Sequence, residues 1–269
     1  MYRPGTELEE VSDAARAHWN APLNLDIARK QFDLLRETYT RHGVEVLEVS
    51  PVEKPSPNLM FVRDLFAMTR IGAILARPAS DVRAGEEVIM SRFLAEHNIP
   101  VLLSVSGEGV FEGPDFVYFD THSAFVGTGI RTNDQGARQV SLALEIQGVE
   151  VIPIQTTYGC GHLDGVLNIV GHRKAILYPT RVSYKVFETL RSRGYSLIPL
   201  PDLGEAERFM AINMVALEPD RVLIPEQCYK TREVLKEHGV GTVPLDLSEL
   251  MKAGGAMHCL TGVIQRAIL

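Results

Sequence analysis

The sequence contains a cysteine, Cys259, in a setting that suits a thiol nucleophile. It follows the pair Gly254-Gly255 and stands directly before the apolar run Leu260 to Ile264. Two adjacent glycines permit backbone conformations that other residues cannot adopt. A thiol of this kind reacts only where a base and charged groups activate it. Because an isolated cysteine is more often a buried core residue, the nucleophile interpretation depends on partners elsewhere in the chain.

A candidate general base lies in the segment Cys160-Gly161-His162-Leu163-Asp164. In an extended segment, alternation would place His162 and Asp164 on one face. A histidine beside a carboxylate is typical of a tuned general base. Two alternatives stay open, namely a satisfied polar histidine and a zinc set of Cys160, His162, His258 and Cys259. The zinc set fits no standard finger spacing, and adjacent residues usually point apart.

Charged residues interrupt two further apolar segments. Arg63 and Asp64 stand in a strand-like apolar run, and Glu112 and Asp115 bracket Gly-Pro among aromatic residues. A charge in such surroundings is costly unless it is paired or functional. Taken alone, each segment could be a solvent-facing pair or an acidic turn. Together with the cysteine and histidine, they predict an active site assembled from distant segments.

The elements that must position these residues follow a repeat. Gly43, Gly148, Gly194, Gly239 and, in one copy, Asn98 each precede an apolar run, as expected where a left-handed residue ends a helix before a strand. Helical periodicity precedes each copy, which predicts helices over 26–42, 83–97, 133–147, 182–193 and 229–238. The strands expected after them are 44–49, 99–103, 149–154, 195–200 and 240–245.

Pairs of short apolar runs separated by turn residues lie between these copies. The predicted hairpins pair 61–68 with 73–76, 116–119 with 124–126, 166–170 with 175–178, and 214–217 with 222–224. One unit therefore contains two strands, a helix and a third strand, and recurs about every 50 residues. The first unit lacks its hairpin, and the last segment, 259–269, supplies a strand without a helix.

The economical interpretation is that the C-terminal strand completes the N-terminal unit. Five ββαβ units then close into a ring with pseudosymmetry, an α/β fold in one catalytic domain spanning residues 1–269. An ordinary open α/β sheet is the alternative. In the ring, the segments that precede the hairpins meet near the axis, where the polar residues described above would converge.

Composition limits the class of protein. The net charge of −7, without a cluster of Lys and Arg, argues against a nucleic-acid partner. No apolar run is long enough to span a membrane, and the first residues lack the apolar core of a signal peptide. Three cysteines suit a reducing cytoplasm better than a disulfide framework. We therefore expect a cytoplasmic protein that acts on a small molecule.

Four motifs, in order, resemble those of the guanidine-modifying superfamily, the penteins, which includes arginine deiminases, dimethylarginine dimethylaminohydrolases and amidinotransferases. Phe61-Val62-Arg63-Asp64 resembles Phe-Thr-Arg-Asp of arginine deiminases. The run 112–115 resembles Glu-Gly-Gly-Asp, with Pro in place of the second Gly. The run 162–164 matches His-Leu-Asp, and 254–261 resembles Gly-Gly-x-x-His-Cys-x-Thr. The resemblance covers the chain from about Pro57 onward and implies a five-fold ββαβ propeller.

The resemblance implies a role for each motif residue. Cys259 would attack the guanidinium carbon and form a covalent amidino-thioether, and His162 would protonate the leaving amine and then activate water. Glu112 would orient His162 and stabilise its charge. Asp64 and Asp164 would accept hydrogen bonds from the planar guanidinium.

The same resemblance extends the expected substrate site. Arg77 and Arg131 would clamp a substrate α-carboxylate, which favours an amino acid such as arginine over agmatine. Asp115 and Asn58 are also expected among the substrate-binding residues. Neither a metal ion nor an organic cofactor is implied. The expected partner is a small guanidino amino acid, and a homo-oligomer stays open.

The motifs favour one activity among several. Asp164 in His-Leu-Asp favours an arginine deiminase or an amidinotransferase over a dimethylargininase, because two carboxylates would crowd the methyl groups. The length of 269 residues instead resembles dimethylargininases. Arginine dihydrolases tend to carry Asn where this chain has Asp64, although Asn20 and Asn58 leave that activity open. We expect hydrolysis of free L-arginine to citrulline and ammonia, with a non-catalytic binding ring as the alternative from another class.

Overall fold

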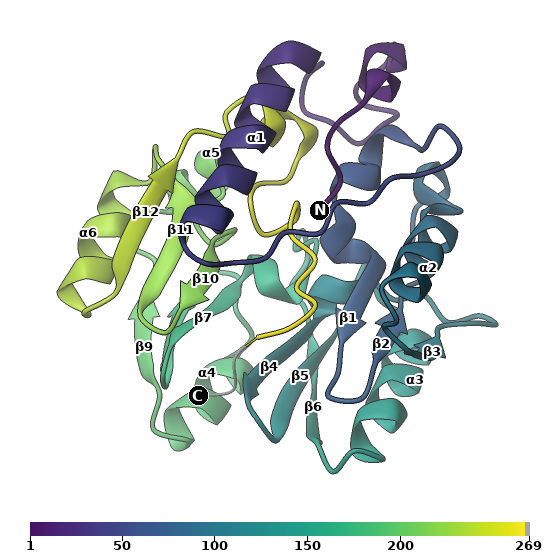
Figure 1. The fold of residues 1–269 in the computed structure, drawn as a ribbon. Helices are drawn as coiled ribbons and strands as arrows, with labels where there is room; N and C mark the ends of the chain where they lie inside the picture. Colours follow the sequence, from purple (N-terminus) through teal and green to yellow (C-terminus); the bar gives the residue numbers. More distant parts are fainter. Residues whose placement is uncertain (267–269) are drawn as a thin grey trace.

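The computed structural model describes residues 1–266, and these contain four three-stranded sheets of the same construction (Figure 1). In each sheet an antiparallel hairpin is extended by a third strand that lies parallel to the second. The sheets contain β1 Phe66–Met68, β2 Ala73–Leu75 and β3 Val101–Ser104; β4 Phe116–Asp120, β5 Ser123–Thr128 and β6 Glu150–Gln155; β7 Leu167–Gly171, β8 Lys174–Leu177 and β9 Ser196–Pro199; and β10 Val215–Glu218, β11 Arg221–Pro225 and β12 Gly241–Leu245.

A helix connects the second strand of each sheet to the third, as a parallel pair requires. These helices are α2 Glu86–Glu96, α3 Asp134–Glu145, α4 Tyr184–Ser192 and α6 Tyr229–Glu237. The strand, strand, helix, strand order that the sequence predicts is therefore confirmed for four units. The longest helix, α1 Leu25–Arg41, precedes the first sheet. A short helix that the sequence analysis did not predict, α5 Leu203–Phe209, lies between β9 and β10.

The predicted helix ends are confirmed in detail. Gly43, Gly148, Gly194 and Gly239 follow their helices with φ of 74°, 70°, 76° and 71°, and Asn98 does so with φ of 55°. An L residue with a side chain rarely adopts such angles, and asparagine tolerates them better than most. The left-handed glycine or asparagine therefore marks the end of each of these five helices, and in four of them a parallel strand follows.

The fifth sheet is not present among the described residues, and the strands predicted over 44–49 and after Cys259 are wrong. Residues 44–49 pair with the start of the chain instead, because the Met1 amino group donates to Leu47 O at 2.7 Å and Val49 N donates to Met1 O at 2.8 Å. Residues 261–266 of the closing segment form no strand. Residues 267–269 of the predicted final strand lie outside the described residues.

The two ends of the chain nevertheless meet, as the ring interpretation requires. Tyr39 Oη of α1 lies 2.8 Å from Thr261 Oγ1, and Phe32 and Leu260 belong to one buried core. Figure 1 shows the yellow closing segment between β1 and β10. Arg266 donates to Ala216 O of β10 at 2.9 Å, so the closing segment reaches the fourth sheet.

Short 3-10 turns precede three of the hairpins and contain the charged residues of the motifs. They are Val62–Leu65 before β1, Gly113–Asp115 before β4 and Leu163–Gly165 before β7. The first of these corrects the expectation that the apolar run around Asp64 is a strand. The first turn contacts the second, and the second contacts the third. The repeat therefore brings the motifs of different units together.

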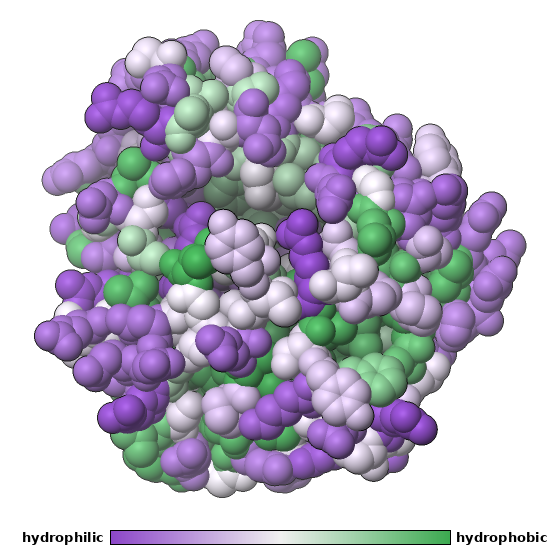
Figure 2. Space-filling view, turned by 180° about the vertical axis from the view of Figure 1, so that it is seen from behind, coloured by the Kyte–Doolittle hydropathy of each residue, from purple (hydrophilic) through white to green (hydrophobic). Residues whose placement is uncertain are grey.

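Figure 2 shows one face of the molecule, with hydrophilic (purple) side chains mainly toward the rim and white and green side chains around a hollow near its centre. Large exposed apolar side chains such as Val52 and Ile146 come from separate elements. No helix within residues 1–266 is long and apolar enough to cross a membrane.

Candidate active site

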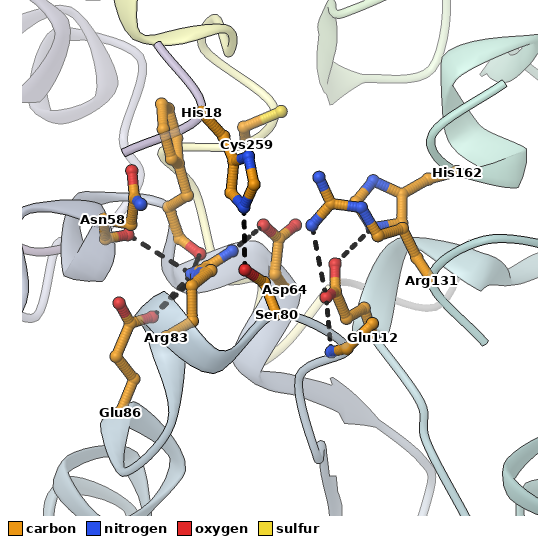
Figure 3. Close-up of polar contacts among 12 residues, drawn as sticks. His18, Asn58, Asp64, Ser80, Arg83, Glu86, Glu112, Arg131, His162 and Cys259 are labelled. Carbon is orange, nitrogen blue, oxygen red and sulfur yellow. Dashed lines mark hydrogen bonds and ion pairs between the residues drawn. The ribbon is translucent and has the colours of Figure 1, made fainter. Parts of the chain in front are cut away.

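A buried glutamate and a half-buried histidine form the central pair of the site (Figure 3). His162 Nε2 lies 2.6 Å from Glu112 Oε2, and Glu112 is completely buried. The other oxygen, Glu112 Oε1, accepts a hydrogen bond from Ala79 N at 3.0 Å. The same oxygen forms an ion pair with Arg131 Nη1 at 3.4 Å. Both carboxylate oxygens are therefore satisfied, and the histidine is fixed in orientation.

This pair sets the charge of the site. Burial disfavours the imidazolium, but the hydrogen bond that His162 donates to Glu112 and the charges of Asp64 and Asp115 outweigh this effect and raise the pKa of His162 to about 9. Burial also opposes the charge of Glu112, but the hydrogen bond and charge of His162 lower the pKa of Glu112 to about 2. At neutral pH the pair is an imidazolium beside a carboxylate.

Asp64 presents an unsatisfied oxygen to the same place. Arg83 Nη1 donates to Asp64 Oδ2, while Asp64 Oδ1 is buried without a hydrogen-bond partner. Atoms of Asp64, Glu112 and His162 lie within 4.8 Å of one another. A buried carboxylate oxygen without a partner is costly, so it indicates a cationic or hydrogen-bonding ligand.

Arg83 holds Asp64 in this position. It is buried and also donates to Glu86 Oε2 at 2.8 Å and to the carbonyl oxygens of Asn58 and Phe61 at 3.2 and 3.1 Å. Burial opposes its charge, but Asp64 and Glu86 outweigh that effect and raise the pKa of Arg83. The sequence analysis missed Arg83, because it lies among polar residues at the start of a helix with no repeat to mark it.

Asp164 is the second buried carboxylate near the cysteine. Its Oδ2 lies 3.4 Å from Arg63 Nε and 3.1 Å from His258 Nδ1, although the latter contact lacks hydrogen-bond geometry. Burial raises the pKa of Asp164 to about 6, with the positive charge of Arg63 opposing the shift. Burial also lowers the pKa of His258, so that side chain is neutral. The segment turns at Leu163, so the extended alternation of His162 and Asp164 is wrong.

Cys259 is half-buried beside these groups. Its carbonyl oxygen accepts from Arg63 N at 3.2 Å, and Asn213 Nδ2 donates to its Sγ at 2.9 Å. Burial and the charges of Asp64 and Asp164 raise the pKa of the Cys259 thiol to about 12. Figure 3 shows Cys259 above Asp64 and His162 to the right of Asp64. The structure thus brings together the cysteine, histidine and acids that the sequence analysis singled out.

The other predicted binding residues make contacts within the protein. Asp115 Oδ1 accepts from Leu163 N at 2.9 Å and thereby joins the second turn to the third. Asn58 accepts from Trp19 Nε1 at 2.7 Å and donates to Ala17 O at 3.0 Å. Arg77 is exposed and donates to the carbonyl oxygen of Gly107. Their roles in substrate binding stay predictions, as does that of Arg131.

Two further residues at the site were not predicted. Asn213 lies in the turn that precedes β10, at the point where other units carry Asp64, Asp115 and Asp164, so the repeat itself could have identified it. His18 has φ of 62° and its Nε2 lies 2.8 Å from Ser80 Oγ (Figure 3). No pattern in the sequence marks His18.

The zinc set considered from the sequence is not assembled among residues 1–266. The one cluster of metal-ligand type in that part of the chain is Asp64, Glu112 and His162, and it contains no cysteine. Cys160 instead directs its Sγ to His162 O at 3.0 Å, and burial raises its pKa to about 11. Cys160 is therefore a structural thiol.

Known proteins resemble this chain over nearly its whole length. The dimethylarginine dimethylaminohydrolase of Streptomyces coelicolor is 27% identical over 87% of this chain and 85% of its own. An uncharacterised Bacillus subtilis protein, YkgA, is 26% identical over 94% of this chain and 86% of its own. Among solved structures, the N-terminal domain of a cyanobacterial arginine dihydrolase covers 100% of this chain and 97% of that one, with a TM-score of 0.85 at 22% identity. A Pseudomonas aeruginosa dimethylarginine dimethylaminohydrolase has a TM-score of 0.78 at 22% identity and covers 94% of this chain and 93% of that one.

These likenesses agree with the motifs and the fold. The structural neighbours show that the α/β fold of this chain is the fold of these enzymes. The model of the family described as "N,N dimethylarginine dimethylhydrolase, eukaryotic" matches residues 7–266. The chain therefore belongs to this family of the guanidine-modifying superfamily and is an enzyme of the class that hydrolyses C–N bonds.

Proposed function

We propose that this enzyme hydrolyses the guanidino group of free L-arginine to citrulline and ammonia through a covalent intermediate on Cys259. The observation that carries the proposal is the imidazolium of His162, held 2.6 Å from Glu112 beside the unpartnered oxygen of Asp64. A proton donor and an unsatisfied carboxylate lie together where the turns before β1, β4 and β7 contact one another. This arrangement suits a planar cation that must lose an amine.

The acids provide the binding site for the cation. Asp64 Oδ1 is free to accept from one side of a guanidinium, and Asp164 presents a second carboxylate near the cysteine. Bidentate pairing of guanidinium with carboxylate is strong and directional. The bound cation also offsets the negative charges that raise the pKa of Cys259. Substrate binding therefore favours the thiolate, and the thiol proton leaves to solvent.

The thiolate then attacks the guanidinium carbon and forms a C–S bond. His162, an imidazolium at neutral pH, donates its proton to the departing nitrogen, and the C–N bond breaks with release of ammonia. Glu112 stabilises the imidazolium before the transfer and keeps Nε2 oriented. The product of this half-reaction is an amidino-thioether on Cys259 with a neutral His162.

Neutral His162 next takes a proton from water, and the hydroxide adds to the carbon of the thioether. Collapse of this adduct breaks the C–S bond, and the hydroxyl proton of the adduct passes to the departing sulfur, so citrulline is released and the Cys259 thiol and the His162 imidazolium are restored. Each proton lost in the first half-reaction is thus replaced in the second. The cycle needs no group beyond the side chains described.

Dimethylarginine is the second candidate substrate, with citrulline and dimethylamine as products. The family match and the curated relatives favour it. The presence of Asp164 favours unmethylated arginine, since a carboxylate on each side of the guanidinium leaves less room for methyl groups. The same groups could also serve an arginine dihydrolase or an amidinotransferase. A non-catalytic binding ring is disfavoured, because the chain belongs to a family of hydrolases.

We also propose that the chain forms a closed five-part ring. We further propose that the protein acts in a reducing compartment such as the cytoplasm. The contacts of the closing segment with Tyr39 and with β10 support the ring. The free thiols of Cys160, Cys228 and Cys259 support a reducing environment.

Product analysis tests the activity. The purified enzyme is incubated separately with L-arginine, asymmetric dimethylarginine and agmatine, and citrulline, ornithine, ammonia and dimethylamine are measured. Citrulline and ammonia from L-arginine are expected, with none from the Cys259→Ser variant. Citrulline from dimethylarginine alone would assign the second candidate. No product from any of the three would reject the proposal.

A further inference from the structure

Asn213 is the residue of the fourth unit that reaches the cysteine. It lies in the turn Ala211–Met214 before β10, far from Cys259 in sequence. Its side chain makes three contacts with one short segment. Asn213 Oδ1 accepts from His258 N at 2.8 Å and lies 3.4 Å from Cys259 N, and Nδ2 donates to Cys259 Sγ at 2.9 Å.

The orientation of this amide follows from its partners. Backbone N–H groups can only donate, so the oxygen of Asn213 must face His258 N and Cys259 N. If the amide were reversed, its NH₂ group would face two backbone N–H groups, and donors would then face donors. The NH₂ group of Asn213 therefore has to face the sulfur. This assignment depends on the backbone of residues 258–259 alone.

A donor directed at the sulfur favours the anion over the neutral thiol. The surroundings of Cys259 otherwise act in the opposite direction, since burial and the carboxylates Asp64 and Asp164 disfavour the thiolate. Asn213 and the backbone of Ala256 counteract them. The same side chain fixes the backbone of the cysteine and one direction of approach to its sulfur.

We propose that Asn213 is a positioning residue that holds the Cys259 sulfur in one orientation and favours its thiolate. The catalytic consequence of this contact rests on the proposed function. The contact itself does not, so it is tested without a substrate. The reaction of Cys259 with a small neutral alkylating agent depends on the thiolate fraction.

The test compares rates of alkylation by iodoacetamide in the full-length protein. Mass spectrometry localises the label to the peptide with Cys259, and Cys259→Ser provides the blank. At any pH well below the thiol pKa, Asn213→Ala is expected to react about tenfold more slowly, because a hydrogen bond to a charged group contributes roughly this much. Asn213→Asp keeps the size and the acceptor oxygen but places a carboxylate beside the sulfur, so its rate should be at least as low.

Asn168 of β7 provides a matched control. Its amide donates to Ile212 O at 3.2 Å and to Met214 O at 2.7 Å, so it holds the same turn without touching the sulfur. Asn168→Ala is expected to lower the thermal midpoint but to leave the alkylation rate within about twofold of the unsubstituted protein. An equal loss of rate in Asn168→Ala and Asn213→Ala would overturn the proposal, because general loosening of the turn would explain both.

Two further outcomes are decisive. Unchanged alkylation in folded Asn213→Ala and Asn213→Asp would also overturn the proposal, whatever the enzyme's substrate. If the enzyme releases citrulline, Asn213→Ala should lower kcat with little change in KM, since Asn213 contacts the sulfur and not the acids. A raised KM with unchanged kcat would contradict this assignment while leaving the proposed hydrolysis intact.

Discussion

His162 Nε2 and Glu112 Oε2 lie 2.6 Å apart, although the two residues come from different units of the repeat. Glu112 is completely buried, so its charge must be balanced inside the protein. His162 balances the charge of Glu112, because at neutral pH its imidazole is protonated and carries a positive charge. One contact therefore joins two units and prepares the leaving-group chemistry.

Replacement of Glu112 by Gln tests whether Glu112 keeps His162 protonated for the leaving-group chemistry. The imidazolium loses its partner, so the pKa of His162 falls from about 9 toward its ordinary value of 6.5. We expect a loss of turnover of about 10²- to 10⁴-fold at neutral pH, the usual contribution of a positioned acid or base. The basic limb of the pH–rate profile should also move to lower pH. An unchanged profile would contradict the assigned role of the pair.

The same pair predicts a pH dependence of stability. The raised pKa of His162 contributes stability that is complete below about pH 6.5 and is lost as the pH rises through about 9. The lowered pKa of Glu112 contributes stability that is complete above about pH 4.5 and is lost as the pH falls toward about 2. Urea unfolding should show a free energy that declines between pH 6.5 and 9.5. This decline should be smaller in Glu112→Gln and unaltered in the exposed control Glu150→Gln.

Arg83→Gln should be among the most destabilising substitutions in the protein. It removes the partner of two buried carboxylates, Asp64 and Glu86, and such losses cost about 3–5 kcal/mol. Arg193→Gln is the matched control, because Arg193 pairs with the exposed Glu150 and should cost no more than about 1 kcal/mol. Chemical denaturation measures the loss of unfolding free energy in each variant. Equal losses would show that Arg83 does not stabilise Asp64 and Glu86 more than a surface ion pair would.

Asp164→Asn tests the choice between arginine and its methylated form. Loss of the second carboxylate should lower kcat/KM for L-arginine by about 10- to 100-fold, since a charged hydrogen bond to the cation is removed. The value for dimethylarginine should fall less, because the methyl groups gain room. The ratio of the two values is the measurement. A fall of the same size for both substrates would remove Asp164 from substrate discrimination.

Tyr39→Phe tests how the closing segment is held. The Tyr39 hydroxyl lies 2.8 Å from Thr261 Oγ1, and both are buried. Its removal should cost about 1 kcal/mol of unfolding free energy. Tyr184→Phe, at an exposed position on α4, should cost nothing measurable. Equal values would indicate that this contact does not contribute to the join of the chain's ends.

The fold was predictable where backbone chemistry repeats. Gly43 and its counterparts mark each helix end, and the apolar runs after them became parallel strands in four units. The fifth unit was mispredicted because an apolar run shows the preference for extended structure but not the pairing partner. Residues 44–49 pair with Met1, which no local pattern reveals.

The site was predictable where motif residues have unusual neighbours. Asp64, Glu112, His162, Asp164 and Cys259 were singled out as charged or reactive residues within apolar segments. Arg83 and Asn213 were not, because their importance lies in what they contact. Conversely, Asn58 was expected to bind substrate, but its amide binds Trp19 and Ala17. Only tertiary structure separates these cases.

The most direct test of the account is the covalent intermediate. The enzyme is mixed with L-arginine, quenched rapidly in acid and digested, and the peptides are analysed by mass spectrometry. An amidino adduct is expected on the peptide that contains Cys259, together with free citrulline, and neither is expected in Cys259→Ser. Citrulline formed at an undiminished rate by Cys259→Ser would contradict the central claim that this thiol is the nucleophile.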